Sequence, residues 1–404
     1  MAHIEDRWFK AGPDGTKARS VRHGTGKRWR VRYIASDGRE RSESFDRKPD
    51  AERFMVATAA QVQSGTWSDP ALGKMTLRRY VEETYLPAQL SEATTRESME
   101  IRFRLHVLST LGDRTLGQLA AEPSVIRAWA AGLQKELSDG YVRTLFANLS
   151  GALQAAVVDG KISRNPCSLV KPPHAASARV KPWTVEQTAS VREALPDRYA
   201  ALADCGAGLG LRQGEAFGLA VEDIDFLRRV VHIRRQVRMV RARLVFAPPK
   251  GGKERDVPLP DSVALRLSAH IAAWPPVLAS LPWKVPDGKP VTARLMFTTR
   301  ERKPLNRNYV NSFIWKPALK VAGMPQTREN GFHALRHHFA SVLLANGVDV
   351  RALATYLGHT DPGFTLRVYT HLMPNAADRM RAAVDHVLAT GGADGPVTAL
   401  GGTL

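Results

Sequence analysis

The C-terminal half of the chain contains the residue types needed to cleave a phosphodiester without a metal. Such chemistry requires a nucleophile, cationic donors to the nonbridging oxygens, and an acid for the leaving 5′ oxygen. The candidates are Arg212, Lys250, His333, Arg336, His359 and Tyr369. Each of them alone has an ordinary structural explanation, such as a helix cap, a solvated loop charge or a core histidine. Their occurrence together is what carries the argument.

Arg212 and Lys250 both lie in glycine-rich segments. Arg212 follows the sequence Gly-Leu-Gly-Leu and begins a predicted helix, whose amide end favours an anion. Lys250 belongs to the sequence Pro-Lys-Gly-Gly-Lys-Glu-Arg at 249–255, which is a predicted turn between two strands and also contains Lys253. These local patterns place a cation at a helix start and another in a turn.

The other candidates lie further along the chain. His333 and Arg336 are three residues apart, a spacing that puts both on one helix face. His333 and His337 also have the spacing of a zinc pair, but the Glu of the HExxH motif is missing, so we expect no metal. Leu-Gly-His at 357–359 precedes Tyr369 by a short, predicted helical interval. A phenol has a pKa of about 10, so Tyr369 needs both proton removal and a cationic site to act as a nucleophile.

The N-terminal segment predicts a three-stranded sheet followed by a helix from Pro49. Residues 27–45 indicate a β-hairpin with a turn at Asp37-Gly38. On its first strand, Trp, Val and Tyr alternate with arginines, so one face is apolar. The opposite face presents Lys27, Arg28, Arg30 and Arg32. This basic row suits a DNA groove or backbone, and the alternative is a solvated surface.

The middle of the chain predicts a helical bundle. Apolar residues recur at three- and four-residue spacing over 77–107 and 141–157, which indicates four or five helices with Arg96 and Arg143 on an outer face. A basic, proline-rich stretch at 171–182 predicts a hinge. Beyond it we expect helices near 184–219, strands over 230–259, helices over 306–388 and a frayed tail. The predicted domains are 1–66, 74–172 and 180–390, with a tail at 391–404.

Composition narrows the class of partner. The chain has 404 residues and a formal net charge of +19, which favours a polyanion, with nucleic acid as the first candidate. No apolar run approaches a membrane span and the start lacks a signal peptide, so we expect a soluble, cytoplasmic protein. The absence of a GxxxxGK[ST] loop argues against ATP-driven work. Cys167 and Cys205 are interpreted as small packing residues.

Taken in order, these motifs resemble the tyrosine recombinase family, which includes phage integrases and chromosome-dimer resolvases. The resemblance rests on an Arg followed three residues later by Glu, a Lys in a β-turn, His-x-x-Arg, Leu-Gly-His, and a Tyr ten residues further on. It implies a multidomain, mainly α fold with β: a small N-terminal sheet domain for arm-type DNA, a helical core-binding domain, and an α+β catalytic domain. The earlier regions match the family more loosely than the C-terminal part.

The family also implies a role for each residue. Arg212 and Arg336 clamp the scissile phosphate, because their planar forks suit paired oxygens. Lys250 is the general acid, with Lys253 as the rival assignment. The remaining implied roles are proton acceptor from Tyr369 for His333, hydrogen-bond donor to the phosphate for His359, orienting group for Glu215, and nucleophile for Tyr369. Attack leaves a 3′-phosphotyrosine, and neither a metal nor a nucleotide cofactor is required.

The resulting hypothesis is an integrase that acts on double-stranded DNA at core and arm sites. Four protomers exchange strands through a Holliday junction, with accessory directionality or DNA-bending proteins as further partners and no membrane. A resolvase or transposon recombinase shares the chemistry. A basic, architectural DNA-binding protein with a degenerate recombinase domain is the alternative from another class. A predicted C-terminal helix over 376–389 docks either on its own domain or on a neighbouring protomer.

Overall fold

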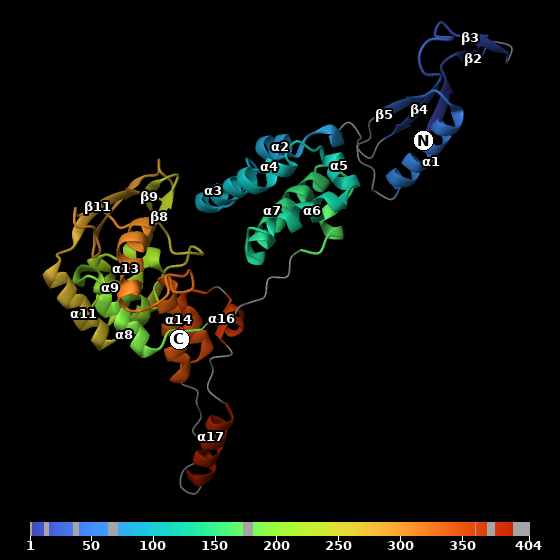
Figure 1. Ribbon diagram of the computed structural model, residues 1–404. Coiled ribbons are helices and arrows are strands. Elements are labelled where there is room, and N and C mark those ends of the chain that lie inside the picture. Colours follow the sequence, from blue (N-terminus) through green and yellow to red (C-terminus); the bar gives the residue numbers. More distant parts are fainter. Residues whose placement is uncertain are drawn as a thin grey trace. The chain divides into compact units, whose positions relative to one another are not determined.

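The computed structural model describes residues 2–11, 16–34, 40–63, 72–172, 181–359, 361–369 and 376–390. The chain divides into two compact units, Met1–Ala176 and Ser177–Leu404 (Figure 1). The boundary falls within the proline-rich stretch predicted as a hinge, most of which lies outside the described residues. The tail beyond residue 390 also lies outside them.

The N-terminal sheet is antiparallel with the order β1-β4-β5. Its strands are β1 (His3–Asp6), β4 (Trp29–Ile34) and β5 (Glu40–Phe45), followed by helix α1 (Lys48–Gln63). Val31 and Tyr33 are buried together with Ala51 of α1, as the alternation along β4 predicted. A second hairpin of β2 (Phe9–Ala11) and β3 (Lys17–Arg19) was not foreseen. The predicted turn at Asp37-Gly38 lies outside the described residues.

The middle region is helical, as its apolar spacing predicted. Its segments are η1 (Leu72–Lys74), α2 (Leu77–Tyr80), η2 (Val81–Tyr85), α3 (Ala93–Arg102), η3 (Phe103–Val107), α4 (Leu108–Leu111), α5 (Leu116–Ala121), α6 (Pro123–Leu133), α7 (Asp139–Val158) and η4 (Pro166–Leu169). Leu77, Phe103 and Leu149 are fully buried in one core, and Cys167 is buried in the same core. The same apolar stripes that predicted helices therefore supply the bundle's interior.

The second unit combines helices with three small sheets. Strands β6 (Ile224–Asp225), β7 (Val230–Ile233) and β10 (Arg255–Pro258) pair in the order β10-β7-β6, while β8 (Gln236–Val240) pairs β9 (Arg243–Ala247) and β11 (Val277–Pro282) pairs β12 (Pro290–Leu295). The preceding helical segments are α8 (Val185–Ala194), α9 (Asp197–Leu209), α10 (Gln213–Phe217) and η5 (Val221–Asp223). The turn that contains Lys250 thus connects strands of two different sheets.

Later helices complete this unit. They are α11 (Asp261–Ala273), α12 (Arg307–Tyr309), η6 (Val310–Trp315), α13 (Lys316–Val321), α14 (His333–Ala345), α15 (Val350–Leu357), α16 (Pro362–Tyr369) and α17 (Ala376–Thr390). Helix α14 packs along α9 (Figure 1), and both contribute to the largest hydrophobic core. Helix α11 and the β11–β12 hairpin fall in a stretch for which the sequence indicated no element.

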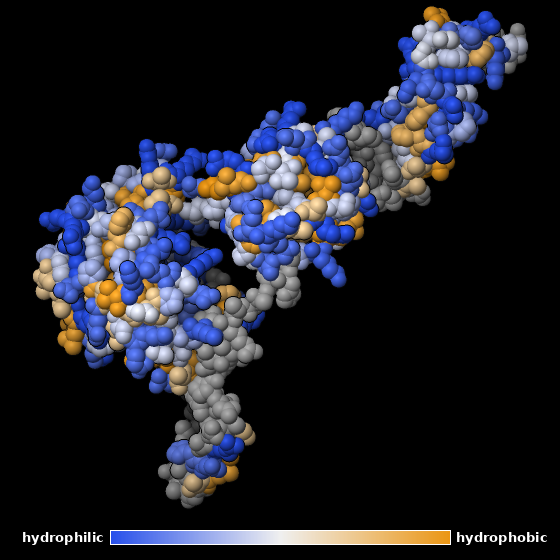
Figure 2. Space-filling view, viewed as in Figure 1, coloured by the Kyte–Doolittle hydropathy of each residue, from blue (hydrophilic) through white to orange (hydrophobic). Residues whose placement is uncertain are grey.

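Helix α17 carries an exposed apolar stripe. Met380, Val384 and Leu388 repeat at four-residue spacing and are exposed, and Figure 2 shows hydrophobic residues beside hydrophilic ones on this helix. The helix expected over 376–389 is therefore present. In the part of the chain that the structure describes, no helix is both long and apolar enough to cross a membrane.

Candidate active site

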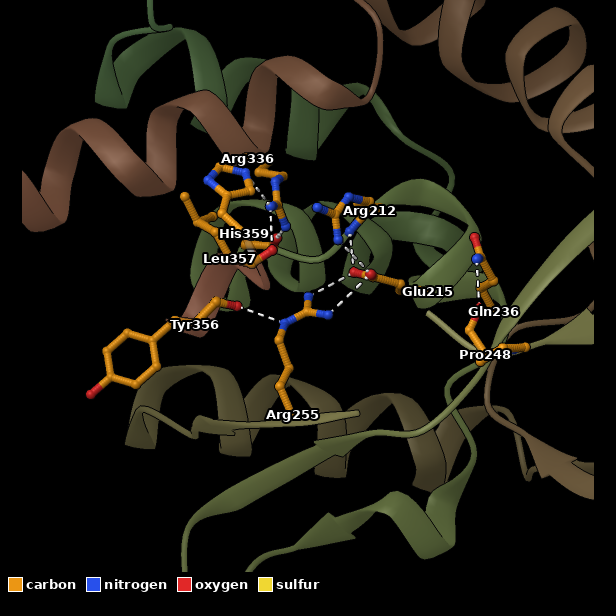
Figure 3. A network of polar contacts seen from close by, with 10 residues as sticks. Arg212, Glu215, Gln236, Pro248, Arg255, Arg336, Tyr356, Leu357 and His359 are labelled. Atoms are coloured by element: carbon orange, nitrogen blue, oxygen red, sulfur yellow. Dashed lines mark hydrogen bonds and ion pairs between the residues drawn. The ribbon is translucent and has the colours of Figure 1, made fainter. Parts of the chain in front are cut away.

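A buried carboxylate joins two arginines from separate elements. Glu215 is 1% exposed and lies in the first turn of α10, where its Oε2 accepts the backbone N–H of Arg212 at 2.9 Å. Its Oε1 accepts a bond from the Arg212 guanidinium, also at 2.9 Å. From β10, Arg255 donates to both carboxylate oxygens, at 3.0 and 2.8 Å (Figure 3). One glutamate therefore fixes two guanidinium groups.

The second predicted phosphate ligand, Arg336, is held by backbone carbonyls. It is 1% exposed and donates to the carbonyl of Gly210 at 2.6 Å and to that of Leu357. Gly210 ends α9 with a φ of +64°, and a Cβ there would lie 2.5 Å from a ring carbon of Phe339. Glycine is thus required for the turn that presents this carbonyl and leads into Arg212.

His359 lies next to the arginines of this cluster, just after the end of α15. Its Nε2 lies 3.1 Å from the Arg336 guanidinium, and its Nδ1 lies 2.8 Å from the Thr365 hydroxyl. The preceding Gly358 has a φ of +63°, which allows the chain to leave the helix at this point. Figure 3 shows Arg212 and Arg336 near His359, with the Tyr356 ring directed away from the cluster.

Positive charge exceeds negative charge in this interior. Arg212 and Arg255 share the carboxylate of Glu215, whereas Arg336 donates to two neutral carbonyls. The cluster therefore contains three positive charges and one negative charge. Burial raises the pKa of Glu215, but Arg255, Arg212 and Arg336 outweigh this effect and lower it to about 2. Burial and Arg212 lower the pKa of Arg336 to about 9, so it stays charged at neutral pH. An anion at this position would offset the excess.

The Tyr369 hydroxyl lies against a histidine. Tyr369 is 2% exposed at the end of α16, and its hydroxyl is 2.7 Å from Nδ1 of His337 on α14. Burial raises the pKa of Tyr369 to about 12, although Arg336 and Arg212 act in the opposite direction. The phenol is therefore protonated in this arrangement and needs a base before it can attack.

The three histidines near the hydroxyl and the arginines are neutral at physiological pH. Burial is the main cause in each case. It lowers the pKa of His333 to about 3, with added effects of His337 and Arg336. It also lowers the pKa values of His337 and His359 to about 4, with Arg336 as the next cause for both. Neutral imidazoles can accept as well as donate protons, which general acid–base chemistry requires.

A family model described as the phage integrase family matches residues 184–376, which include every member of this cluster. The phiRv2 prophage integrase of Mycobacterium tuberculosis is 26% identical over 362 residues, covering 85% of this chain and 88% of that protein. The chain belongs to the phage integrase family of tyrosine recombinases. The motif order in the C-terminal unit had indicated the same family.

Solved structures share the recombinase fold. The integrase of transposon Tn1549 bound to transposon right end DNA has a TM-score of 0.65 and 21% identity, covering 78% of this chain and all of that chain. A lambda integrase tetramer bound to a Holliday junction has a TM-score of 0.57 and 16% identity, covering 85% and 92%. The multidomain, mainly α architecture predicted from the sequence is confirmed.

Two residues of the recombinase cluster were missed as candidates. The Tyr369 proton was assigned to His333, whereas the structure places His337 at that hydroxyl. His337 lies one helical turn after His333, so the rule that pairs residues four apart could have identified it. Arg255 and Val257 are buried in β10 while Asp256 and Pro258 are exposed, so strand alternation placed Arg255 inward.

The two candidate acids of the recombinase stand apart from the cluster. Lys250 and Lys253 are exposed, and neither forms a hydrogen bond or ion pair with the residues that the structure describes. The base of their turn is fixed, because Gln236 of β8 donates to the Pro248 carbonyl at 2.7 Å (Figure 3). The turn itself contains Gly251 and Gly252, both with positive φ. The contacts of the described residues therefore do not decide which of the two lysines is the acid.

Two of the predicted DNA-binding arginines of the N-terminal sheet, Arg28 and Arg32, have protein partners. Arg28 pairs with Asp6 at 2.8 Å and lies over the ring of Trp29, with 4.7 Å between its guanidinium carbon and the ring centroid. Arg32 pairs with Glu5 and Glu40 at 3.3 and 3.4 Å. Arg30 is half-buried and Lys27 is exposed. The basic row is therefore only partly available to a ligand.

The helical region presents its predicted contacts unevenly. Arg143 is exposed on α7, whereas Arg96 on α3 is half-buried and donates to the Gln89 carbonyl. Among the described residues, no group of three or more His, Cys, Asp or Glu side chains is arranged to hold a metal ion. In particular, His333 and His337 are adjacent rings, 4.6 Å between centroids, in an edge-to-face arrangement.

Proposed function

We propose that this recombinase is an integrase that cleaves and rejoins double-stranded DNA through a 3′-phosphotyrosine at Tyr369. One observation carries the proposal: the hydroxyl of Tyr369, the candidate nucleophile, lies 2.7 Å from His337 on α14, the helix that also carries Arg336 of the buried, net cationic cluster. A phosphodiester supplies the missing anion. As the phosphorane forms, its added negative charge is stabilised by donors that are already in place.

The proposed cleavage step conserves bonds. The Tyr369 hydroxyl gives its proton to a neighbouring histidine as its oxygen bonds to the scissile phosphorus, and the bond from phosphorus to the 5′ oxygen breaks. Arg212 and Arg336 bind the nonbridging oxygens, and His359 donates to one of them. Lys250, delivered by its glycine-rich turn, protonates the leaving oxygen. Because one phosphodiester replaces another, the reverse step rejoins DNA without an external energy source.

We assign the remaining parts by analogy with the relatives. Residues 1–66 bind arm-type DNA through Lys27, Arg28, Arg30 and Arg32, and residues 74–172 bind the core site with help from Arg96 and Arg143. Residues 180–390 are catalytic. Four protomers act together on two core sites in the cytoplasm of a bacterial or phage-infected cell, with accessory DNA-bending or directionality proteins. The relative bound to a Holliday junction as a tetramer supports this assembly.

The test begins with the Tyr369→Phe protein, because it retains the whole cationic cluster. Duplexes that bind it are selected from a random library and then nicked next to the bound site, so that cleavage releases a short fragment and religation fails. The wild-type protein should form a covalent adduct on such a duplex that resists denaturing electrophoresis. Tyr369→Phe should form none while retaining the DNA.

Two results would contradict the proposal. An adduct that persists in Tyr369→Phe would place the nucleophile elsewhere. Selective DNA binding by the wild-type protein with no adduct on any nicked duplex would favour an architectural protein with a degenerate recombinase domain.

A further inference from the structure

The candidate nucleophile is hydrogen-bonded to a histidine outside the motif residues. Nδ1 of His337 is 2.7 Å from the Tyr369 hydroxyl, a distance typical of a short hydrogen bond. His333 and Tyr369 form no hydrogen bond in the described chain, although His333 lies one turn earlier on the same face of α14. The two histidines therefore differ in their geometry: only His337 is hydrogen-bonded to the Tyr369 hydroxyl.

The direction of this hydrogen bond follows from the protonation states. Tyr369 is a neutral phenol, because its pKa is raised to about 12 by burial. His337 is a neutral imidazole, because burial and then Arg336 lower its pKa to about 4. A neutral phenol next to a neutral imidazole donates a hydrogen bond to the unprotonated ring nitrogen. Nδ1 of His337 is then the acceptor, and Nε2 carries the ring proton.

We propose that His337 is the general base of this recombinase, its Nδ1 taking the Tyr369 proton as the phenol oxygen attacks phosphorus. The assignment rests on the proposed strand-transfer function. In the forward step, the proton moves from the phenol to His337, the bond from oxygen to phosphorus forms, and the leaving 5′ oxygen takes a proton from Lys250. In the rejoining step, the 5′ hydroxyl returns its proton to the neutral Lys250 as its oxygen attacks phosphorus, and the imidazolium returns its proton to the phenolate that departs from phosphorus.

Bound DNA makes this base effective. In the protein alone, transfer from Tyr369 to His337 is strongly unfavourable, because their pKa values lie far apart and Arg336 opposes an imidazolium. A phosphate between Arg212 and Arg336 offsets their charge, and the phosphorane adds more negative charge as it forms. Both changes favour protonated His337. The nucleophile is therefore activated only where a phosphodiester is bound.

A cavity beside the two histidines gives access to solvent. Its volume is about 910 Å³, and its lining includes His333, His337, Arg238, Asn308 and Arg328. DNA or water can therefore reach the histidine pair without moving the core. His333 shares this cavity but forms no hydrogen bond with the phenol oxygen, which makes it the natural control for His337.

The test uses His337→Asn and the matched variant His333→Asn, each with Tyr369 or a fluorinated tyrosine at position 369. The Asn amide takes roughly the place of Nδ1 but cannot accept a proton. General-base catalysis typically contributes about 100-fold or more. Single-turnover adduct formation on the nicked duplex should fall by about that factor in His337→Asn. Fluorination lowers the phenol pKa, so it should restore most of the loss in His337→Asn and little of any loss in His333→Asn.

Each other result has a definite meaning. Rescue of His333→Asn alone, or no rescue of His337→Asn despite normal DNA retention, would overturn the assignment. Should His337→Asn fail to fold, His337→Gln is measured in the same way, since Gln also cannot act as a base. Failure of the proposed function itself is distinguishable, because the wild-type protein would then form no adduct with either tyrosine.

Discussion

The Arg255 guanidinium binds both carboxylate oxygens of Glu215, and the same residue also donates from Nε to the Tyr356 carbonyl at 2.7 Å. This one side chain therefore connects β10 with α10 and with the end of α15. Breaking a buried pair by removing one partner typically costs about 3–5 kcal/mol, since the other charge remains buried. Because Arg212 still pairs with Glu215, we expect Arg255→Gln to lower the free energy of unfolding by up to that amount and to reduce adduct formation.

A matched control is available on the surface of the same unit. Arg229 and Asp261 form an ion pair at 2.8 Å, but their side chains are 57% and 73% exposed. Exposed pairs contribute about 0–1 kcal/mol, so Arg229→Gln should change stability little. Chemical denaturation of the two variants and the wild type decides the matter. Equal stability of Arg255→Gln and Arg229→Gln would contradict a structural role for Arg255.

Gly358 should tolerate no side chain, for two separable reasons. Its φ of +63° disfavours any L residue, and a Cβ there would meet the Arg255 side chain at 3.0 Å. Gly323 has a φ of +68° and open space around the same position, so Gly323→Ala carries the backbone cost alone. We expect Gly358→Ala to lose more stability than Gly323→Ala in thermal unfolding, and to lose adduct formation as well. Equal losses would mean that the Arg255 contact is unimportant.

The general acid can be identified through the leaving group. A 5′-thiol leaves without protonation, so a duplex with a bridging 5′-thio linkage should restore cleavage to a variant that lacks the acid. We expect rescue of Lys250→Ala and none for Lys253→Ala, measured as the ratio of cleavage rates on thio and oxygen duplexes. Rescue of Lys253→Ala instead would move the role within the same turn.

The C-terminal unit should lose stability on acidification, starting near pH 6.5. His333, His337 and His359 have pKa values lowered to about 3, 4 and 4 in the folded protein, mainly by burial. Above pH 6.5 both folded and unfolded chains are neutral at these sites. Below it, the unfolded chain binds protons that the folded chain excludes, so stability falls.

Glu215 extends the effect to lower pH. Its folded pKa of about 2 lies below the ordinary value, despite burial, because of Arg255, Arg212 and Arg336. Its contribution to stability is complete above the ordinary pKa and is lost as pH falls toward 2.

For the histidines, we expect the melting temperature to drop between pH 7 and pH 5, with a smaller drop in His333→Gln. A melting temperature that is constant over this interval would contradict the pKa directions of the histidines.

How far the sequence could predict the site depended on how many positions separate the interacting residues along the chain. Arg336 was identifiable because His333 lies three residues earlier on the same helix face. Glu215 was expected to orient its neighbours because of the resemblance to the recombinase family. The bond between Arg255 and Glu215 spans forty positions, and that between His337 and Tyr369 spans thirty-two. Neither follows from local spacing, because each depends on how separate elements pack.

The fold shows the same division. The alternation along β4 and the apolar stripes of the helical region predicted buried faces correctly, since each pattern reports the element that contains it. The β11–β12 hairpin was missed. Its buried Ala279 and Ala293 are small and directly paired, and alanine is a weak strand signal. The order of strands in the sheets, including the placement of β9 and β10 in different sheets, depends on packing between elements. Local patterns therefore could not predict it.

Two basic residues of the N-terminal sheet region should differ in role: Arg28 should stabilise the fold, and Lys27 should contact DNA. Arg28 pairs with Asp6 and lies over aromatic rings, so Arg28→Ala removes packing as well as charge. Lys27 is exposed, so Lys27→Ala should leave stability unchanged within about 0.5 kcal/mol. If Lys27 contacts a phosphate, the slope of log affinity against log salt should decrease in magnitude by about 1.

The measurement is arm-type DNA binding by the full chain at several salt concentrations, together with thermal unfolding of each variant. Arg28→Ala should lower the melting temperature of the N-terminal unit, and any loss of binding should follow from that instability. Lys27→Ala should change the salt slope alone. A stable Arg28→Ala protein with a reduced salt slope would instead make Arg28 a direct DNA ligand, whose pairing with Asp6 is exchanged for a phosphate on binding.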